Sequence, residues 1–382
     1  MVHSVMIHCA DLPDPRHARG KRHVLSDLLT IAICAVICGA EGWAEVEEFG
    51  LSKQQWFKGF LELPHGIPSH DTFGRVFAAL DPAALEGCFE QWTAALQRHS
   101  RGKLVRVDGK SLRQSFAHAW DKSGMAHLVS AFVSENRLVL GQVALEQAGA
   151  DEQQRRDNEI TVIPKLLQML DLQGCTVSID AIGCQRAIAQ QIVDQQADYV
   201  LCVKNNQPTL HLQVRKLLDE AILEAFKDLP GEFVQETDGE HGRIEIRRLW
   251  VTDQVQHLKL PEAWPALSSI AAVERVREVI GQGTSTERHY YISSLKGCDA
   301  QRMAQAIRGH WSIENQLHWH LDVSFAEDAC RIRKGHADEN FSRLRRIALN
   351  LLQRETSNKR GIKIKRLRAG WDHDYLLKVL RG

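Results

Sequence analysis

The sequence lacks the features that would assign it to several common classes of protein. Its nine cysteines include no Cys-x-x-Cys pair, and Cys34, Cys175 and Cys202 lie in apolar runs where cysteine behaves as a small hydrophobic residue. No P-loop signature is present, which argues against an ATP-driven step and a nucleotide cofactor. The N-terminus carries no signal-peptide pattern. We therefore expect a protein of the reducing cytoplasm.

Long hydrophobic runs are also missing. The most apolar segment, residues 28–40, has only thirteen residues, whereas a helix needs about 20 to cross a bilayer. It follows Ser26 and Asp27, residue types that favour the start of a helix. We therefore expect a buried helix there and no membrane partner.

The chain has no excess of either charge, because 48 Lys and Arg balance 48 Asp and Glu. The charges are nevertheless unevenly distributed. Between Arg331 and Arg368 there are thirteen Lys or Arg and three acids, an excess of about ten positive charges. This stretch predicts phosphate neutralisation and DNA binding that weakens steeply with salt. A solvated face without a ligand is the alternative.

Residues 1–100 show the spacing of a helical N-terminal domain, with apolar residues three and four apart. Within it, residues 68–76 open with Pro68 and Ser69 and would project His70 and Arg75 outward, as a DNA recognition helix does. An ordinary amphipathic core helix is the alternative. We expect this domain to bind DNA ends if the first interpretation holds.

From residue 103 the pattern changes to that of strands joined by helices. The order strand-strand-strand-helix-strand-helix-strand predicts an α/β, RNase H-like mixed sheet with helices on both faces, its first three strands forming an antiparallel meander. The predicted strands cover residues 103–108, 126–133, 137–145, 175–180 and 198–203. The predicted parts are residues 101–204 and 298–350 for the core, 205–297 for a largely β insertion, and 351–382 for a basic C-terminal segment.

Two aspartates fall at the ends of predicted strands, Asp108 after the first and Asp180 after the fourth. Because neighbouring strands lie about 4.8 Å apart, two carboxylates at adjacent strand ends can share a cation. Oxygen ligands select hard ions, so Mg²⁺ is expected, with Mn²⁺ as a substitute. Alternatively, Asp108 begins an Asp-Gly turn and Asp180 caps the following helix.

A third carboxylate, Glu314, lies on a predicted helix over residues 301–321, on one face with Ile307, Trp311 and His318. Metal and a nearby Arg or His are both suitable partners for it. A zinc site is a further alternative, although His318 and His320 project to different faces of a helix. The zinc set would be His310, His318, His320 and Asp322. Three converging carboxylates predict a nuclease or a DNA strand-transfer enzyme.

Ten blocks of sequence, in order along the whole chain, carry a family resemblance. They are residues 19–23, 66–73, 108–110, 138–142, 158–160, 179–185, 204–207, 308–315, 321–328 and 340–349. In these blocks the chain resembles the H-repeat-associated proteins and related bacterial insertion-sequence transposases with a DDE catalytic triad.

The resemblance implies a triad of Asp108, Asp180 and Glu314 that holds two Mg²⁺ ions, cleaves element ends and joins them to target DNA. It also implies partners: terminal repeats, target DNA, and a second copy in a homodimer on DNA, at the bacterial nucleoid. Many relatives carry Tyr, Arg and Lys around the catalytic Glu, where this sequence has Ile307, His310 and Leu321, with Arg308 as a replacement for the Arg.

Basic residues near these motifs and in the C-terminal stretch are candidate DNA contacts. They are Lys110, Lys204, Arg308, His310, Arg331, Arg333, Lys334, Lys363, Lys365 and Arg366. In the insertion, His241, Arg243 and Arg247 form either a DNA contact or a solvated hairpin. Asp322 and Asp328 are alternatives to Glu314 as the third ligand. The alternative function is a catalytically inactive, transposase-derived DNA-binding protein.

Overall fold

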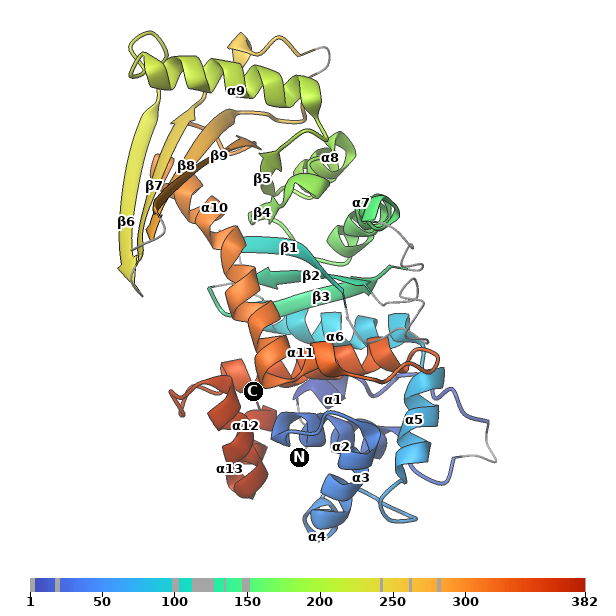
Figure 1. Cartoon of the computed structure of the whole chain (residues 1–382). Helices are drawn as coiled ribbons and strands as arrows, with labels where there is room; N and C mark the ends of the chain where they lie inside the picture. Colours follow the sequence, from blue (N-terminus) through green and yellow to red (C-terminus); the bar gives the residue numbers. More distant parts are fainter. Residues whose placement is uncertain are drawn as a thin grey trace. The chain divides into compact units, whose positions relative to one another are not determined.

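The computed structural model describes most of the chain, and Figure 1 labels its helices and strands. The described residues are 4–17, 21–97, 103–111, 127–133, 135–145, 152–240, 243–260, 263–279 and 283–381. The chain divides into two compact units. Unit 1 comprises Met1–His99, Gly109–Asn158 and Glu314–Gly382, and unit 2 comprises Ser100–Asp108 and Glu159–Ile313.

Unit 2 is built on a mixed sheet in the order β1-β4-β5-β9-β8-β7-β6. Strands β1, β4 and β5 run parallel to one another, and β9, β8, β7 and β6 continue the sheet in antiparallel fashion from β5. The bounds are β1 Leu104–Ser111, β4 Thr176–Ile179, β5 Asp198–Val203, β6 Glu232–Glu240, β7 Arg243–Thr252, β8 Ser269–Val279 and β9 Gly283–Ser293. The β insertion predicted from sequence therefore extends the core sheet.

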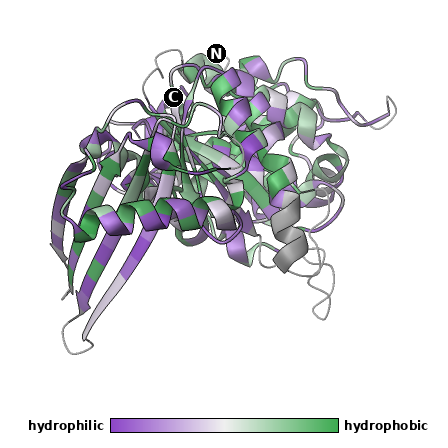
Figure 2. Cartoon of the chain, turned by 90° about the horizontal axis from the view of Figure 1, so that it is seen from above, coloured by the Kyte–Doolittle hydropathy of each residue, from purple (hydrophilic) through white to green (hydrophobic). Residues whose placement is uncertain are grey.

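Two helices cover opposite faces of the antiparallel strands. Tyr290 of β9 donates a hydrogen bond to Asp219 of α9 (Pro208–Leu223), whereas Tyr291 packs with Met303 of α10 (Ala300–Ile313). Successive side chains of a strand point to opposite faces, so α9 and α10 lie on different sides of the sheet. Figure 2 shows the matching alternation of hydrophobic and hydrophilic residues along these strands. The predicted α/β class, a mixed sheet with helices, is confirmed.

The parallel strands are connected by helices, as the sequence pattern predicted. Helix α7 (Glu152–Gln168) precedes β4, and α8 (Arg186–Asp194) lies between β4 and β5. Gln191 of α8 donates to the carbonyl of Pro164 in α7 at 2.8 Å, so these two helices pack together.

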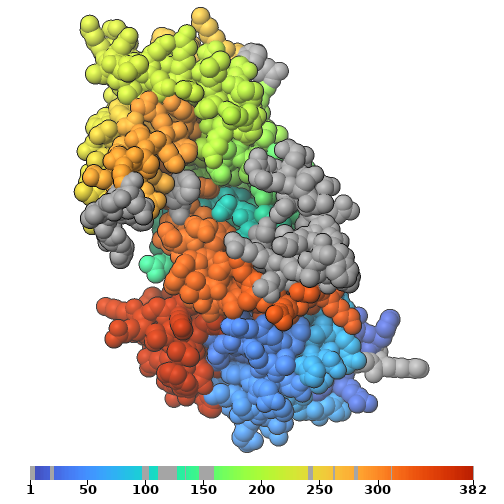
Figure 3. Space-filling view, viewed as in Figure 1, coloured from blue at the N-terminus to red at the C-terminus, as the bar shows by residue number. Residues whose placement is uncertain are grey.

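Unit 1 combines helices from both ends of the chain with a β-hairpin. The hairpin strands β2 and β3 pair antiparallel, as the predicted meander requires. Figure 3 shows the C-terminal helices, in red, against the N-terminal helices, in blue. The bounds are α1 Ser4–His8, α2 Leu25–Cys38, α3 Trp43–Ser52, α4 Gln54–Phe57, α5 His70–Ala79, α6 Pro82–Gln97, β2 His127–Val133, β3 Leu138–Ala144, α11 Ala337–Arg354, α12 Ile362–Trp371 and α13 His373–Arg381.

Helix α11 is buried within unit 1, and several of its polar residues bind backbone groups or buried carboxylates. Asn340 donates to the carbonyls of Phe77 and Leu80 at 2.8 and 2.9 Å. Asn350 pairs with both the N–H and the carbonyl of Val139, at 2.9 Å each. A buried polar group without a partner is costly, so these bonds fix how α11 meets the N-terminal helices and β3.

The basic stretch between Arg331 and Arg368 does not form one positive surface, contrary to the expectation from charge counting. Five of its cations are buried: Arg343, Arg345, Arg346, Lys365 and Arg366. Arg343 pairs with Glu86 at 2.6 Å and Arg346 with Glu327 at 3.0 Å. Desolvation alone would raise the pKa of Glu327, but Arg346 and Arg345 outweigh it and hold that pKa below its usual range.

Lys365 and Arg366, which we expected to contact DNA, serve packing in the structure. Lys365 donates to the carbonyls of Leu352 and Glu355, and Arg366 donates to the carbonyl of Val36 at 2.9 Å. The Arg366 guanidinium also lies 4.1 Å from the centre of the Phe325 ring. These contacts tie α12 to α11 and α2, because each cation satisfies carbonyls that helix ends leave without an intrahelical partner.

Helix α2, the apolar segment of the sequence, is buried as predicted. No single helix in the described part of the chain is long and apolar enough to cross a membrane. Together with α3 it forms one strongly bent pair that meets the criteria of length and composition.

Glu90 on α6 predicts a measurable pH dependence of stability. Burial, reinforced by the neighbouring Glu86, raises the pKa of Glu90 from 4.5 to about 8. Between these values the folded protein keeps a proton that the unfolded chain releases, so stability falls as pH rises through this window. Glu90→Gln should therefore raise Tm by roughly 2 °C at pH 8 and by less at pH 5. The expected rise in Tm is kept small because Glu90 is partly exposed and solvent screens its charge. Thermal unfolding at both pH values tests this. The exposed Glu62→Gln should show no such difference, and equal behaviour of the two variants would contradict the assignment.

Candidate metal centre

Asp108 lies within β1 and Asp180 directly follows β4, at neighbouring positions of two parallel strands. The register of β1 and β4 pairs Val107 with Ile179, so each aspartate is the next residue on its strand. Paired residues of neighbouring parallel strands point to the same face of the sheet. The neighbourhood of the two aspartates, inferred from strand order in the sequence, is confirmed.

The structure shows neither an Asp-Gly turn at Asp108 nor a helix cap by the side chain of Asp180. Strand β1 continues to Ser111, three residues beyond the end we expected, so Asp108 does not begin a turn. Asp180 precedes the 3₁₀ turn Ala181–Gly183, yet its side chain makes no capping hydrogen bond.

His310 of α10 lies beside both aspartates. Its Nδ1 is 3.2 Å from the hydroxyl of Ser178 on β4, two residues before Asp180. Burial lowers the pKa of His310, and the charges of Asp108 and Asp180 oppose that shift. The imidazole is therefore neutral at pH 7 and connects the helix to the strand without adding positive charge.

Arg106 provides a second connection between α10 and the sheet. It is buried on the same face of β1 as Asp108, and its Nη1 donates to the Ser312 hydroxyl at 2.6 Å. Gly309 makes room for it, because a Cβ at that position would lie 2.3 Å from Leu104 and 2.6 Å from the Arg106 guanidinium. Helix α10 is thus held at two points to the strands that carry the aspartates.

The loop after β5 supports the loop that follows Asp180. Asn206 donates to the carbonyl of Ala181 at 2.6 Å, and Gln207 donates to that of Cys184 at 3.0 Å. Lys204 is half exposed, and its Nζ lies 3.5 Å from the carboxylate of Asp180. Residues 204–207 thus contribute one cation and two amides that hold the neighbouring loop.

Glu314 is the residue that directly follows α10, and it is exposed. The helix predicted over residues 301–321 is present, but it is α-helical only to Ile313 and continues mainly as π-helical turns over Glu314–His318 and His320–Ser324. Glu314 is exposed, although α-helical spacing had placed it on one face with large apolar residues. A carboxylate oxygen of Glu314 and a ring nitrogen of His318 lie within 4.8 Å of each other.

Asp322 and Asp328, the alternative third ligands, share a cation in unit 1. Lys110 is buried and pairs with Asp322, and its Nζ lies 3.6 Å from Asp328. Lys110 itself, a predicted DNA contact, is therefore engaged by two carboxylates.

Four further predicted DNA contacts of unit 1 lie at its surface, unlike the buried Lys365 and Arg366. Arg331, Arg333 and Lys334 are exposed in the segment before α11, and Lys363 is exposed on α12.

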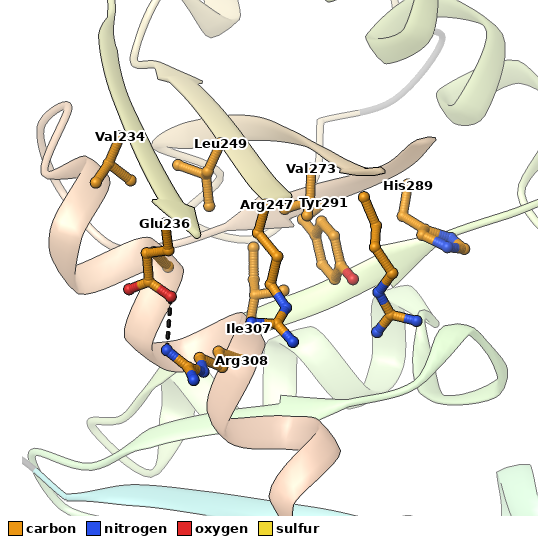
Figure 4. A pocket seen from close by; sticks show the side chains of 11 residues that line it. Val234, Glu236, Arg247, Leu249, Val273, His289, Tyr291, Ile307 and Arg308 are labelled. Atoms are coloured by element: carbon orange, nitrogen blue, oxygen red, sulfur yellow. Dashed lines mark hydrogen bonds and ion pairs between the residues drawn. The ribbon is translucent and has the colours of Figure 1, made fainter. Parts of the chain in front are cut away.

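A cleft in unit 2 lies between α10 and the antiparallel strands, and Figure 4 shows the side chains that line it. Its floor is apolar and includes Leu249, Tyr291 and Ile307. Arg308 at its edge pairs with Glu236 at 2.7 Å, as the dashed line in Figure 4 marks. Arg247 also lines the cleft and pairs with Glu245 at 2.7 Å, whereas His241 lies outside the described residues.

The chain matches two family models in succession. A model described as DDE_Tnp_1-associated covers residues 6–93, and one described as the transposase DDE domain covers residues 99–351. The chain belongs to the DDE transposase family.

Full-length relatives agree with this membership. The chain is 37% identical to "H repeat-associated putative transposase YhhI" of Escherichia coli K12, over 99% of the chain and 98% of the relative. It is also 37% identical to "Putative transposase YncI" of Escherichia coli O157:H7, over 99% of the chain and 95% of the relative. A shorter relative, "Inactive transposase YbfQ" of Escherichia coli K12, is 46% identical over 19% of the chain and 86% of its own length.

Sequence reasoning missed the residues that position the aspartates of this DDE-family chain. Arg106 and Ser178 each lie two residues before an aspartate, on the same face of the strand. This spacing in the sequence could have identified them as neighbours of the aspartates. Gly309 interrupts an otherwise helical run, which often marks a close approach of another segment.

The two glycines Gly309 and Gly87 predict opposite responses to alanine. Alanine is the better helix former by about 1 kcal/mol, so helix propensity alone favours both changes. Gly87→Ala on α6, where a Cβ meets nothing within 4 Å, should stabilise the protein by about 0.5–1 kcal/mol. Gly309→Ala should destabilise it by about 1–3 kcal/mol, because Leu104 and Arg106 must move. Denaturant unfolding measures both, and a stabilising Gly309→Ala would rule out the close packing of α10 on β1.

Proposed function

We propose that this member of the DDE transposase family is an active, metal-dependent enzyme that cleaves the DNA ends of its element and joins them to target DNA. The observation that carries the proposal is the position of Asp108 and Asp180, each directly after one partner of the register pair Val107 and Ile179 on neighbouring parallel strands. Strand geometry brings two like charges together here, and proteins keep such an arrangement where a cation offsets the repulsion.

The proposed ligands are Asp108, Asp180 and Glu314, holding two Mg²⁺ ions for which Mn²⁺ can substitute. The donor chemistry fits, because all three ligands are carboxylates and hard ions prefer oxygen. Glu314 is preferred over Asp322 and Asp328 because it is exposed, whereas Lys110 pairs with both alternatives. When bound, such ions stabilise the charge that develops on the attacking and leaving oxygens of a phosphodiester.

The remaining residues position these ligands and the DNA. Lys204, next to Asp180 and half exposed, supplies a positive charge for a substrate phosphate. His310 and Arg106 hold α10 to β4 and β1, and thereby fix where the chain reaches Glu314. Asn206 keeps the loop after Asp180 in place.

The proposed partners are the terminal repeats of the element, target DNA and a second copy of the chain, in the bacterial cytoplasm. Exposed cations before α11 and on α12, among them Arg331, Lys334 and Lys363, are the C-terminal residues available for phosphate. Two DNA ends must be brought together for strand transfer, and a homodimer provides one site for each end.

A catalytically inactive DNA-binding protein is the second candidate. The printed name of the partial relative, "Inactive transposase YbfQ", is the observation in its favour. Such a protein would keep its basic surface, but its function would not depend on the three carboxylates.

Isosteric neutral variants separate the two functions. Asp108→Asn, Asp180→Asn and Glu314→Gln should each lower the cleavage of element-end DNA in Mg²⁺ by roughly 10³-fold or more, because an amide is a poor ligand for Mg²⁺. DNA binding in EDTA should change little. Cleavage is followed on labelled element-end duplexes, and binding by fluorescence anisotropy.

Asp171→Asn and Asp322→Asn are the matched controls for these variants. Asp171 is an exposed acid of unit 2, and its loss should leave cleavage unchanged. A wild-type protein that binds the ends but never nicks or joins them would refute the enzymatic proposal. A loss of cleavage in Asp322→Asn with normal cleavage in Glu314→Gln would move the third ligand to Asp322.

A further inference from the structure

A basic pocket lies among the N-terminal helices of unit 1. Its volume is about 640 Å³ and it is open to solvent. Five of the residues around it are basic, Arg16, Arg22, His23, His65 and Arg75, and the hydroxyl of Thr72 joins them. No carboxylate belongs to the described lining. A concave surface with cations and no acids favours an anion.

Arg16 is the rigid part of this wall. Asp14 accepts hydrogen bonds from its Nε and Nη2 at 2.9 and 2.8 Å, and this pairing holds the guanidinium fork in one orientation. Its Nη1 has no hydrogen-bond partner among the described residues. The guanidinium of Arg16 is therefore held in one orientation at the pocket wall.

Arg22 and Arg75 are the exposed cations of the pocket. Arg75 lies on α5, and its Nε donates to the carbonyl of Asp71 at 3.2 Å, so the side chain runs back along the first turn of the helix. The N-terminal end of a helix carries partial positive charge, which adds to the attraction for an anion. Ser69 caps this helix through the N–H of Thr72.

Asp14 pairs with Arg16 of the pocket wall, whereas two other nearby acids are engaged elsewhere. Glu47 binds the backbone N–H and the ring of His70, at 2.8 and 2.6 Å. Asp27 is buried and accepts the N–H of Leu63 at 2.9 Å. Burial lowers the pKa of His23, and the neighbouring His65 and Arg16 lower it further. Arg22 and Arg75 are therefore the arginines of the pocket whose charge no described ion pair offsets.

We propose that this pocket binds a backbone phosphate of the DNA on which the protein acts, with Arg22 and Arg75 as the contacting cations and Arg16 as the oriented wall. The inference rests on the proposed function for the identity of the ligand, and it extends that function by giving the N-terminal helices a DNA site of their own. Arginine suits this role because its planar fork matches phosphate oxygens. A phosphate contact carries no base specificity, so the site strengthens binding equally on all sequences.

Single neutral substitutions in the full-length protein test the proposal. Arg22→Gln and Arg75→Gln should each weaken binding to a labelled duplex by roughly 3- to 10-fold at moderate salt, and should reduce the slope of log K against log salt by about 1. Lys58→Gln is the matched control, because Lys58 is an exposed cation of the same helices that does not line the pocket. It should change affinity by less than about twofold. Anisotropy titrations at several salt concentrations, in EDTA and with two unrelated duplexes, give these values.

Three outcomes decide the question. A larger loss for both pocket variants than for the control, on both duplexes and with unchanged Tm, supports the proposal. Equal effects of pocket and control variants overturn it. Loss of thermal stabilisation by inorganic phosphate in the pocket variants, with unchanged DNA affinity, also overturns it by assigning the pocket to a small free anion. Because EDTA prevents metal-dependent cleavage, these results are independent of whether the enzyme proposal holds.

Discussion

The pairing of β1 with β4 in one particular register is the constraint on which the candidate centre depends. A shift by one residue would turn Asp108 or Asp180 to the other face of the sheet, since side chains alternate along a strand. The register is set within the sheet, where Val105, Val107, Val177 and Ile179 are buried. Hydrophobic burial thus forces two carboxylates together although their charges repel.

The position of helix α10 depends on the same sheet. It lies on the sheet through Met303, Ala306 and Ile307, and two polar contacts at its C-terminal end fix its position beside the aspartates. The following residue is Glu314, where α-helical geometry changes to π-helical turns. Such turns often occur at functional sites because they reorient one residue without ending the helix.

Unit 1 shows how misleading a count of charges can be. Helix α11 contains arginines and asparagines that look solvent-exposed by composition, yet Asn340, Arg346 and Asn350 have no exposed surface. They are buried because each finds a backbone carbonyl, a backbone N–H or a carboxylate inside the unit. The cations that remain at the surface, including Arg22 and Arg75 near the N-terminus, therefore indicate ligands better than the total number of charged residues does.

The sequence alone determined the α/β class, the order of strands and helices, and the neighbourhood of Asp108 and Asp180. These follow from local periodicity and from strand order, both of which can be read along the chain. Only the tertiary structure decided the exposure of Glu314, the burial of Lys365 and Arg366, and the roles of Arg106, Ser178 and Gly309. The reason is physical: exposure and pairing depend on residues far away in sequence, such as Val36 for Arg366 and Ser312 for Arg106, and no local pattern encodes those partners.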